Sequence, residues 1–179
     1  KINLDGSITP LLAESWAIDP DGRSYTFRLR KGVKFSDGEA FDASDVKFSF
    51  ERYKGAGVKL LKERVREVQI VDPVRIRFLL KEPWPDFMTY YGTLASGAGW
   101  IVPKKYTEQV GDDGFKKHPI GLGPYKFVSH TPGIELVMEA VETYWRIVPH
   151  VKRLVFKSVP EPATRLALLN AEIALGQHD

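Results

Sequence analysis

The sequence predicts a mixed α/β fold of the α+β type, rich in antiparallel hairpins and with few helices. Three pairs of strand-like segments are each joined by a short turn that contains proline, at Asp19-Pro20-Asp21-Gly22, Asp72-Pro73 and Thr131-Pro132-Gly133. Proline presets φ in such turns and glycine supplies a positive φ, so these sequences favour tight connections between paired strands.

The predicted strands are marked by apolar and polar side chains in alternation. Tyr25, Phe27 and Leu29 alternate with polar neighbours after a first strand that includes residues 16–18, which is typical of strands buried on one face. The same pattern predicts the remaining strands, at residues 65–71, 74–80, 125–130, 134–139 and 152–159.

Helices are predicted where proline or an acidic residue precedes an apolar repeat. Pro162 suits a first helical position, because Leu166, Leu169 and Ile173 follow at helical spacing. Two further helices are predicted: one opens at Pro103 and stops at Gly111, and one starts near Asp86 with the apolar stripe Phe87, Tyr90, Tyr91 and Leu94.

The stretch FSDGEAFDASDVKFSFER, residues 35–52, is rich in carboxylates, which raises the question of a metal or acid–base site. Asp42 and Asp45 have the spacing of a helix N-cap and the third helical residue, where backbone N–H groups lack partners and the helix dipole favours negative charge. The helix so begun places Val46, Phe50 and Tyr53 on one face. We therefore interpret these carboxylates as architecture.

A calcium site is the competing interpretation of this stretch. An EF-hand loop needs an oxygen ligand at its fifth position and a bidentate Glu at its last. Counted from Asp37, these positions hold Phe41 and Phe48. The histidines, His118, His130, His150 and His178, also lack metal-ligand spacing. No metal and no other cofactor is expected.

Composition excludes several classes of protein. The chain has 179 residues, of which 43% are hydrophobic and 27% charged, as in ordinary globular proteins. Its 26 basic and 23 acidic residues are interspersed, so a nucleic-acid partner is not expected. There is no cysteine for a disulfide or thiolate site. Ile2 and Leu4 look strand-like, which suggests that the chain begins inside a fold.

Enzyme signatures are weak. Gly121 and Gly123 lack the third glycine of a dinucleotide fingerprint, and Pro124-Tyr125 opens a strand where that fingerprint needs a helix. A tight turn is the simpler interpretation. The nucleophile-elbow pattern G-x-S-x-G is absent, and nothing marks two carboxylates as a buried pair. An enzyme is not expected.

Ordered sequence blocks along nearly the whole chain resemble the extracellular solute-binding proteins of family 5. The blocks are Leu11-Leu12-Ala13-Glu14-Ser15-Trp16; Tyr25-Thr26-Phe27 through Gly32-Val33-Lys34-Phe35 to Asp37-Gly38; Asp45-Val46-Lys47-Phe48-Ser49; Ile101-Val102-Pro103-Lys104; Pro119-Ile120-Gly121 to Gly123-Pro124-Tyr125-Lys126-Phe127; Tyr144-Trp145; and Thr164-Arg165-Leu166-Ala167. The segment Leu168 to Ala174 departs from the family pattern, because it lacks the Gly and Asp expected there.

The resemblance implies a two-lobed receptor with a periplasmic-binding-protein-like type II architecture, of which this chain is the first lobe only. By resemblance, residues 1–102 are the inserted hairpin-rich domain of that lobe. Residues 103–179 are then the returning segment of its incomplete main domain, and the second lobe is absent.

Candidate ligand-binding residues lie in two glycine-rich segments. Four small residues, Ser96, Gly97, Ala98 and Gly99, precede Trp100, which suggests close approach of another strand or of a ligand. By resemblance this segment faces the cleft. Leu60 follows a flexible loop, Gly55-Ala56-Gly57, and Tyr90 is a further candidate. Two alternatives stay open: Trp100 is core, and Tyr90 and Tyr91 are core and surface residues.

The resemblance implies a non-enzymatic receptor that captures a solute, with peptide as the expected cargo, and delivers it to the permease subunits of an ABC importer. Its location would be periplasmic or extracellular, with or without a membrane anchor. Members that bind nickel carry an arginine near Trp100, and this chain has none between Lys81 and Lys104. The alternatives are a saccharide or other small solute, and a protein-interaction module without small-molecule cargo.

Overall fold

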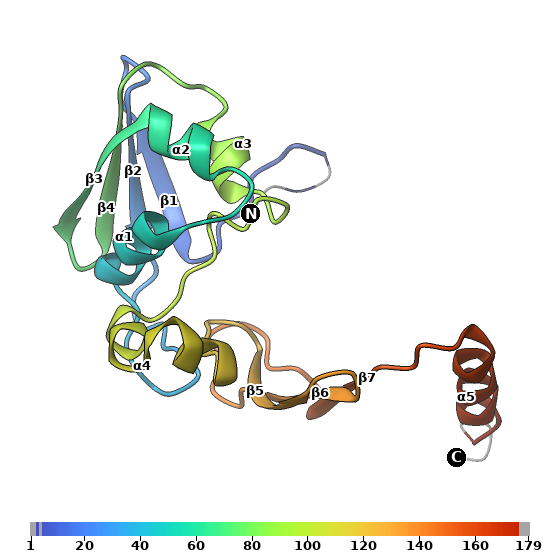
Figure 1. Ribbon diagram of the computed structural model, residues 1–179. Coiled ribbons are helices and arrows are strands. Elements are labelled where there is room, and N and C mark those ends of the chain that lie inside the picture. The colour runs from blue at the N-terminus through green and yellow to red at the C-terminus, as the bar shows by residue number, and fades with distance from the viewer. Residues whose placement is uncertain (1–2, 4, 176–179) are drawn as a thin grey trace. The chain divides into compact units, whose positions relative to one another are not determined.

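The computed structural model describes residue 3 and residues 5–175, which form two compact units, Lys1–Gly123 and Pro124–Asp179. The predicted strand character of Ile2 and Leu4 falls outside the described residues. The strands are β1 (Ala13–Ile18), β2 (Ser24–Leu29), β3 (Val65–Asp72), β4 (Arg75–Leu80), β5 (Tyr125–Thr131), β6 (Glu135–Ala140) and β7 (Arg153–Lys157) (Figure 1). The helices are α1 (Ala43–Arg52), α2 (Val58–Arg64), α3 (Phe87–Gly92), α4 (Lys104–Lys117) and α5 (Pro162–Leu175).

The first unit is built on an antiparallel sheet with the strand order β1-β2-β4-β3. Tyr25 pairs with Phe78 and Phe27 with Ile76, so the apolar side chains of β2 and β4 share one face. Both hairpins predicted in the first 80 residues are confirmed. Each forms because its alternating apolar residues can be buried together once a proline-containing turn reverses the chain.

The core of this unit is a cluster of aromatic rings between the sheet and its helices. Phe78 lies at the centre, fully buried, with its ring centroid 5.3 Å from those of Phe50 in α1 and Phe87 in α3. Phe87 and Tyr91 stack at 5.5 Å with their ring planes 7° apart. Edge, tilted and offset contacts of this kind add to the stabilisation from area burial alone. The predicted apolar stripe of the helix near Asp86 is thereby confirmed for Phe87 and Tyr91, but it is wrong for Leu94, which lies beyond the helix end at Gly92 and is exposed.

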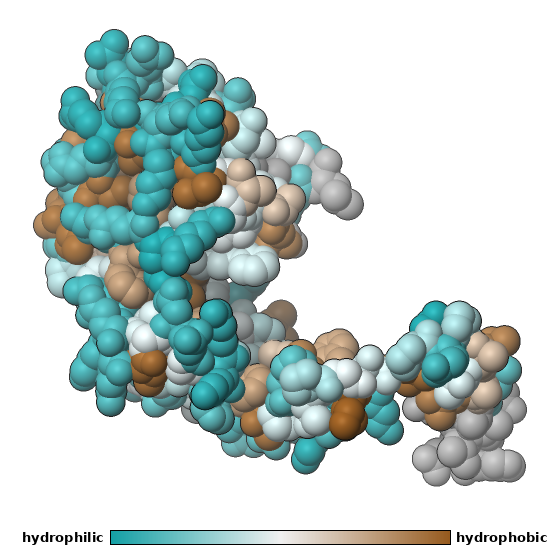
Figure 2. Space-filling model, viewed as in Figure 1, coloured by the Kyte–Doolittle hydropathy of each residue, from teal (hydrophilic) through white to brown (hydrophobic). Residues whose placement is uncertain are grey.

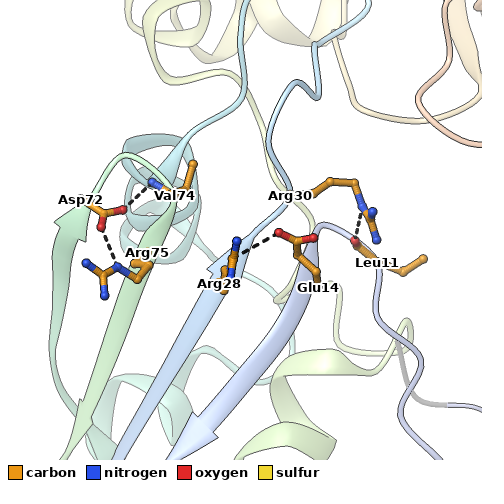
Figure 3. Close-up of polar contacts among 7 residues, drawn as sticks. All are labelled: Leu11, Glu14, Arg28, Arg30, Asp72, Val74 and Arg75. Atoms are coloured by element: carbon orange, nitrogen blue, oxygen red, sulfur yellow. Dashed lines mark hydrogen bonds and ion pairs between the residues drawn. The ribbon is translucent and has the colours of Figure 1, made fainter.

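The opposite face of the sheet carries charged side chains, among them Arg28 and Arg75. Arg28 and Arg75 face each other across β2 and β4, an arrangement of like charges that destabilises a sheet unless it is compensated. Figure 3 shows the compensation: Glu14 lies 3.5 Å from Arg28, and Asp72 accepts a 2.6 Å hydrogen bond from Arg75. Hydrogen bonds from Arg75 and the Val74 N–H lower the pKa of Asp72.

The acidic stretch begins α1 as predicted. Asp42 is the N-cap, and its carboxylate accepts a 2.6 Å hydrogen bond from Ser44 N. Asp45 reaches back to accept a 3.0 Å bond from Asp42 N, which completes a reciprocal capping box. The carboxylates of Asp42 and Asp45 therefore both accept hydrogen bonds from backbone N–H groups at the start of α1.

Two helices differ from the prediction. α2 is not predicted by the sequence, which indicates only a flexible loop, Gly55-Ala56-Gly57, ahead of Leu60. It forms after Gly57 without a side-chain cap, because it can bury Leu61 completely. α4 begins at Lys104, directly after Pro103, but does not stop at Gly111. That residue is non-helical, with φ 70°, and helical structure resumes up to Lys117. The glycine interrupts the helix but does not terminate it, because glycine adopts a positive φ without strain.

The second unit contains the sheet β5-β6-β7 and helix α5. The predicted third hairpin, the strand near residues 152–159 and the helix starting at Pro162 are all confirmed. Several apolar side chains of this unit are exposed, namely Ile134, Val155, Phe156, Leu166 and Leu169. Figure 2 shows brown, hydrophobic atoms at the surface of this unit. The expected domains 1–102 and 103–179 rest on family chain order and stay a prediction.

The buried hydroxyl of Tyr91 leads to a stability prediction. Among the described residues this hydroxyl has no hydrogen-bond partner, and burial raises its pKa. Tyr91→Phe should raise the free energy of unfolding by about 1 kcal/mol. In the wild-type chain, folding removes water from the Tyr91 hydroxyl without giving it a hydrogen-bond partner, and the variant avoids this cost. Urea unfolding of the 179-residue chain measures this.

Tyr106→Phe is the matched control, because the Tyr106 hydroxyl donates a 2.9 Å hydrogen bond to the His118 carbonyl. It should lower the free energy of unfolding by about 0.5–1 kcal/mol. Equal losses in the two variants would show that the Tyr91 hydroxyl has a partner after all.

Candidate ligand-binding surface

One face of α1 fixes the backbone of the segment that contains the candidate residues. Asp45, Ser49 and Tyr53 recur every four residues and therefore lie in a row along the helix and its C-cap. Asp45 accepts a 2.8 Å bond from Lys104 N, Ser49 accepts a 2.9 Å bond from Val102 N, and Tyr53 donates a 2.5 Å bond to the Ser96 carbonyl. These side chains hold residues 96–104 at three points.

Tyr53 also connects the two glycine-rich segments. Its hydroxyl accepts a 3.1 Å bond from Gly57 N while it donates to Ser96. A Cβ on Gly55 would lie 2.5 Å from the Tyr53 hydroxyl, so a side chain there would displace this ring. The loop expected to border the site therefore lies beside the Ser96 segment.

The small residues before Trp100 have a structural cause. A Cβ on Gly99 would lie 2.7 Å from the Tyr91 carbonyl oxygen, so the close approach predicted for this segment is made by the chain itself. Gly97 has φ 67°. A Cβ added to Gly97 would lie 3.6 Å from the nearest atoms of the Trp100 indole. Ala98 is buried, and the Ser96 hydroxyl donates to the Tyr90 carbonyl at 2.8 Å.

Trp100 is 66% exposed, so the alternative that it is a core residue is wrong. Tyr90 is exposed and packs against Trp84 at 5.3 Å between ring centroids, whereas the Tyr91 ring joins the aromatic core. Leu60 is half-buried on α2, next to fully buried Leu61. The structure thus brings Tyr90, Ser96 and Trp100 onto one surface segment.

A pocket of about 240 Å³ lies next to Trp100. Its walls are the C-terminal end of α1, Lys54, Trp100 with Val102, and Asp112 of α4. Asp112 accepts a 2.6 Å bond from Arg52 and lies 3.6 Å from the Lys54 ammonium. The hydrogen bond and charge of Arg52, with the charge of Lys54, lower the pKa of the Asp112 carboxyl. Two cations therefore meet one ionised carboxylate at this pocket.

No sequence pattern predicted this pocket. Arg52 and Asp112 are 60 residues apart and come together because α1 packs on α4. Cation–π contacts help to position the guanidinium, which lies 5.6 Å from the Phe48 centroid and 5.8 Å from that of Phe115. No spacing rule links residues on separate helices.

Asp37, another acidic residue of the stretch 35–52, has a local role. Asp37 accepts a 3.0 Å bond from Glu39 N within a turn. Within residue 3 and residues 5–175, no three His, Asp or Glu side chains are placed to hold a metal ion, and His178 falls outside this range. In the same part of the chain, no helix has both the length and the apolar character to cross a bilayer.

The family model for "Bacterial extracellular solute-binding proteins, family 5 Middle" matches residues 7–175. The chain belongs to this family. The dipeptide-binding protein of Escherichia coli K12 is 32% identical to this family 5 chain over 90% of the chain and 34% of its own length.

Solved structures of other family 5 proteins share the fold. NikZ from Campylobacter jejuni, in complex with Ni(L-His), has a TM-score of 0.82 and 31% identity over 96% of this chain and 35% of its own. MoaA from A. tumefaciens R10, in complex with mannopinic acid, has a TM-score of 0.85 and 30% identity over the same shares. The predicted periplasmic-binding-protein-like type II architecture is confirmed. The family 5 chain spans about a third of the length of these relatives.

Asp45 leads to a mutational prediction, because its buried carboxylate accepts N–H groups at the starts of two helices. Asp45→Ala should lower the free energy of unfolding by about 2–3 kcal/mol, since it leaves two backbone donors without acceptors. Thermal and urea unfolding measure the loss. Asp113→Ala is the matched control, because that side chain is 91% exposed. A comparable loss in both variants would contradict the capping role.

Asp112 leads to a pH prediction. Because its pKa is lowered in the folded state, its contribution to stability is present above the unfolded value of 3.8 and is lost as pH falls through the folded pKa. Asp112→Asn should therefore make the loss of folding free energy below pH 3.8 smaller than in the wild-type chain. Urea unfolding across a pH series tests this, and identical pH profiles for wild type and Asp112→Asn would refute it.

Proposed function

We propose that this chain is part of a non-enzymatic receptor that captures a small solute between two lobes and delivers it to the permease subunits of an ABC importer. The observation that carries the proposal is the exposed Trp100 indole, displayed on a segment whose backbone α1 holds at three points. A rigid scaffold that presents an exposed aromatic residue is typical of a binding surface. Membership of the solute-binding family supports the same function.

The proposed binding residues are those of the two adjoining segments: Leu60, Tyr90, Ser96, Gly97, Ala98, Gly99 and Trp100. Because Gly97 and Gly99 have structural reasons to lack side chains, their contribution to cargo binding would come from the backbone. Ser96 and Trp100 then supply side-chain chemistry.

Peptide is the proposed cargo, because the E. coli relative is a dipeptide-binding protein. The NikZ and MoaA complexes with Ni(L-His) and mannopinic acid show that similar chains serve other solutes. A saccharide or another small solute is therefore the alternative cargo. A protein-interaction module without small-molecule cargo is the alternative function, and the exposed apolar side chains of the second unit support it.

Hinge closure is the proposed mechanism. A ligand drives closure only if it makes contacts in the closed form that the open form lacks. In this proposal residues 1–102 and 103–179 form the inserted domain and the returning part of the first lobe. The rest of the receptor supplies the facing half of the cleft. The receptor would act in the periplasm or outside the cell, free or anchored to the membrane.

Isothermal titration with di- to pentapeptides tests the proposal on two samples, the intact gene product and the 179-residue chain. The intact protein should bind peptide. The 179-residue chain should bind it at least roughly 100-fold more weakly, because one face of the peptide stays in water. Small-angle scattering of the intact protein should show compaction when peptide is added.

Equal affinity of the two samples would contradict capture between two lobes. Sedimentation at several concentrations distinguishes the interaction module, which would self-associate and bind no solute. Turnover in a hydrolase screen of the intact protein would contradict the non-enzymatic assignment.

A further inference from the structure

The pocket beside Trp100 offers hydrogen-bond donors that the protein itself does not use up. The hydroxyl of Ser49 is committed to Val102, and that of Tyr53 binds both Ser96 and Gly57. Of the remaining polar side chains in the lining, Arg52 carries five N–H groups and Lys54 three, and both contact the carboxylate of Asp112. A ligand that replaces water here must therefore be rich in acceptors.

The charge of the pocket points in the same direction. Two cations against one carboxylate leave a net positive charge. The Arg52 guanidinium is positioned by Asp112 at 2.6 Å and by the rings of Phe48 and Phe115, so this pocket-lining group has little conformational freedom to lose when it binds a ligand. Lys54 is 84% exposed and can reach a ligand from the rim. A carboxylate suits a guanidinium and an ammonium held in this way.

Two other lining residues are apolar, Trp100 and Val102. The Trp100 indole packs on Gly97 and remains 66% exposed. The pocket volume of about 240 Å³ is below the usual range for drug-sized ligands and matches a single amino-acid residue more closely. A bound group should thus combine a carboxylate with one apolar side chain.

We propose that this pocket is a subsite for the C-terminal residue of a peptide. The terminal carboxylate binds Arg52 and Lys54, and an apolar side chain packs on the indole of Trp100. The inference rests on the proposed function and narrows it, because it selects cargo with a free carboxyl end and an apolar last residue.

Nuclear magnetic resonance of the 179-residue chain tests the subsite without lobe closure. The chain contains 4 tryptophans, so its indole N–H resonances are few and assignable by substitution. N-acetyl-L-leucine should shift the Trp100 indole resonance in a saturable way, with a millimolar dissociation constant. N-acetyl-L-leucinamide, which lacks the carboxylate, should bind at least about tenfold more weakly.

Variants assign the two halves of the subsite. Trp100→Ala should weaken binding of N-acetyl-L-leucine about tenfold. Because this variant lacks the indole signal, its affinity is measured from the backbone resonances of Val102 and Lys54. Lys54→Met should weaken binding of N-acetyl-L-leucine several-fold and should make the affinity less dependent on salt concentration. Lys59→Met is the matched control, because Lys59 is an exposed lysine of α2 that does not line the pocket. It should leave the affinity unchanged.

Equal binding of the acid and the amide, or the absence of any shift at Trp100, would overturn the proposal. A saturable shift with D-glucose and none with N-acetyl-L-leucine would also overturn it in favour of a sugar subsite. These failures are distinct from failure of the receptor function. The intact protein could still bind peptide and close around it through other contacts.

Discussion

The row of polar side chains on α1 is the constraint on which the binding surface depends. Asp45 and Ser49 belong to α1 and Tyr53 is its C-cap, and this helix buries Val46 and Phe50 in the core. Their polar atoms bind backbone groups of residues 96–104, a segment that includes no strand and has few apolar anchors of its own. Without these bonds, the segment would depend on local turns alone, and the indole of Trp100 would have no fixed position.

Asp45 shows how a buried carboxylate can be structural. Burial raises its pKa, and two backbone N–H groups oppose that shift by stabilising the ionised form. The N–H groups come from Asp42 and Lys104, at the first turns of α1 and α4, where helix dipoles also favour negative charge. One side chain thereby sets the spacing between two helix starts, and residues farther along each helix, Arg52 of α1 and Asp112 of α4, line the pocket.

Sequence patterns predicted the hairpins, the start of α1 and the start of α5, because these depend on local chemistry: a turn residue, a cap, or a period of two. They also led to the segment 96–100. They missed α2, whose formation depends on a burial site for Leu61 that other elements provide. They missed Arg52 and Asp112 for the same reason, since this ion pair exists only after α1 and α4 have packed. Gly111 predicts the end of a helix, whereas in the structure it interrupts α4 and helical structure resumes after it. Glycine occurs at helix ends and at breaks within helices, so the residue alone does not distinguish the two.

The crowding at Gly99 restricts how the chemistry of this surface can be altered. Any side chain at that position would collide with the main-chain oxygen of Tyr91, and position 97 requires a backbone geometry that other amino acids rarely adopt. Ala98 points into the interior. Within residues 96–100, laboratory evolution of a new ligand preference would therefore have to work through Ser96 and Trp100, which leaves two variable sites in this segment.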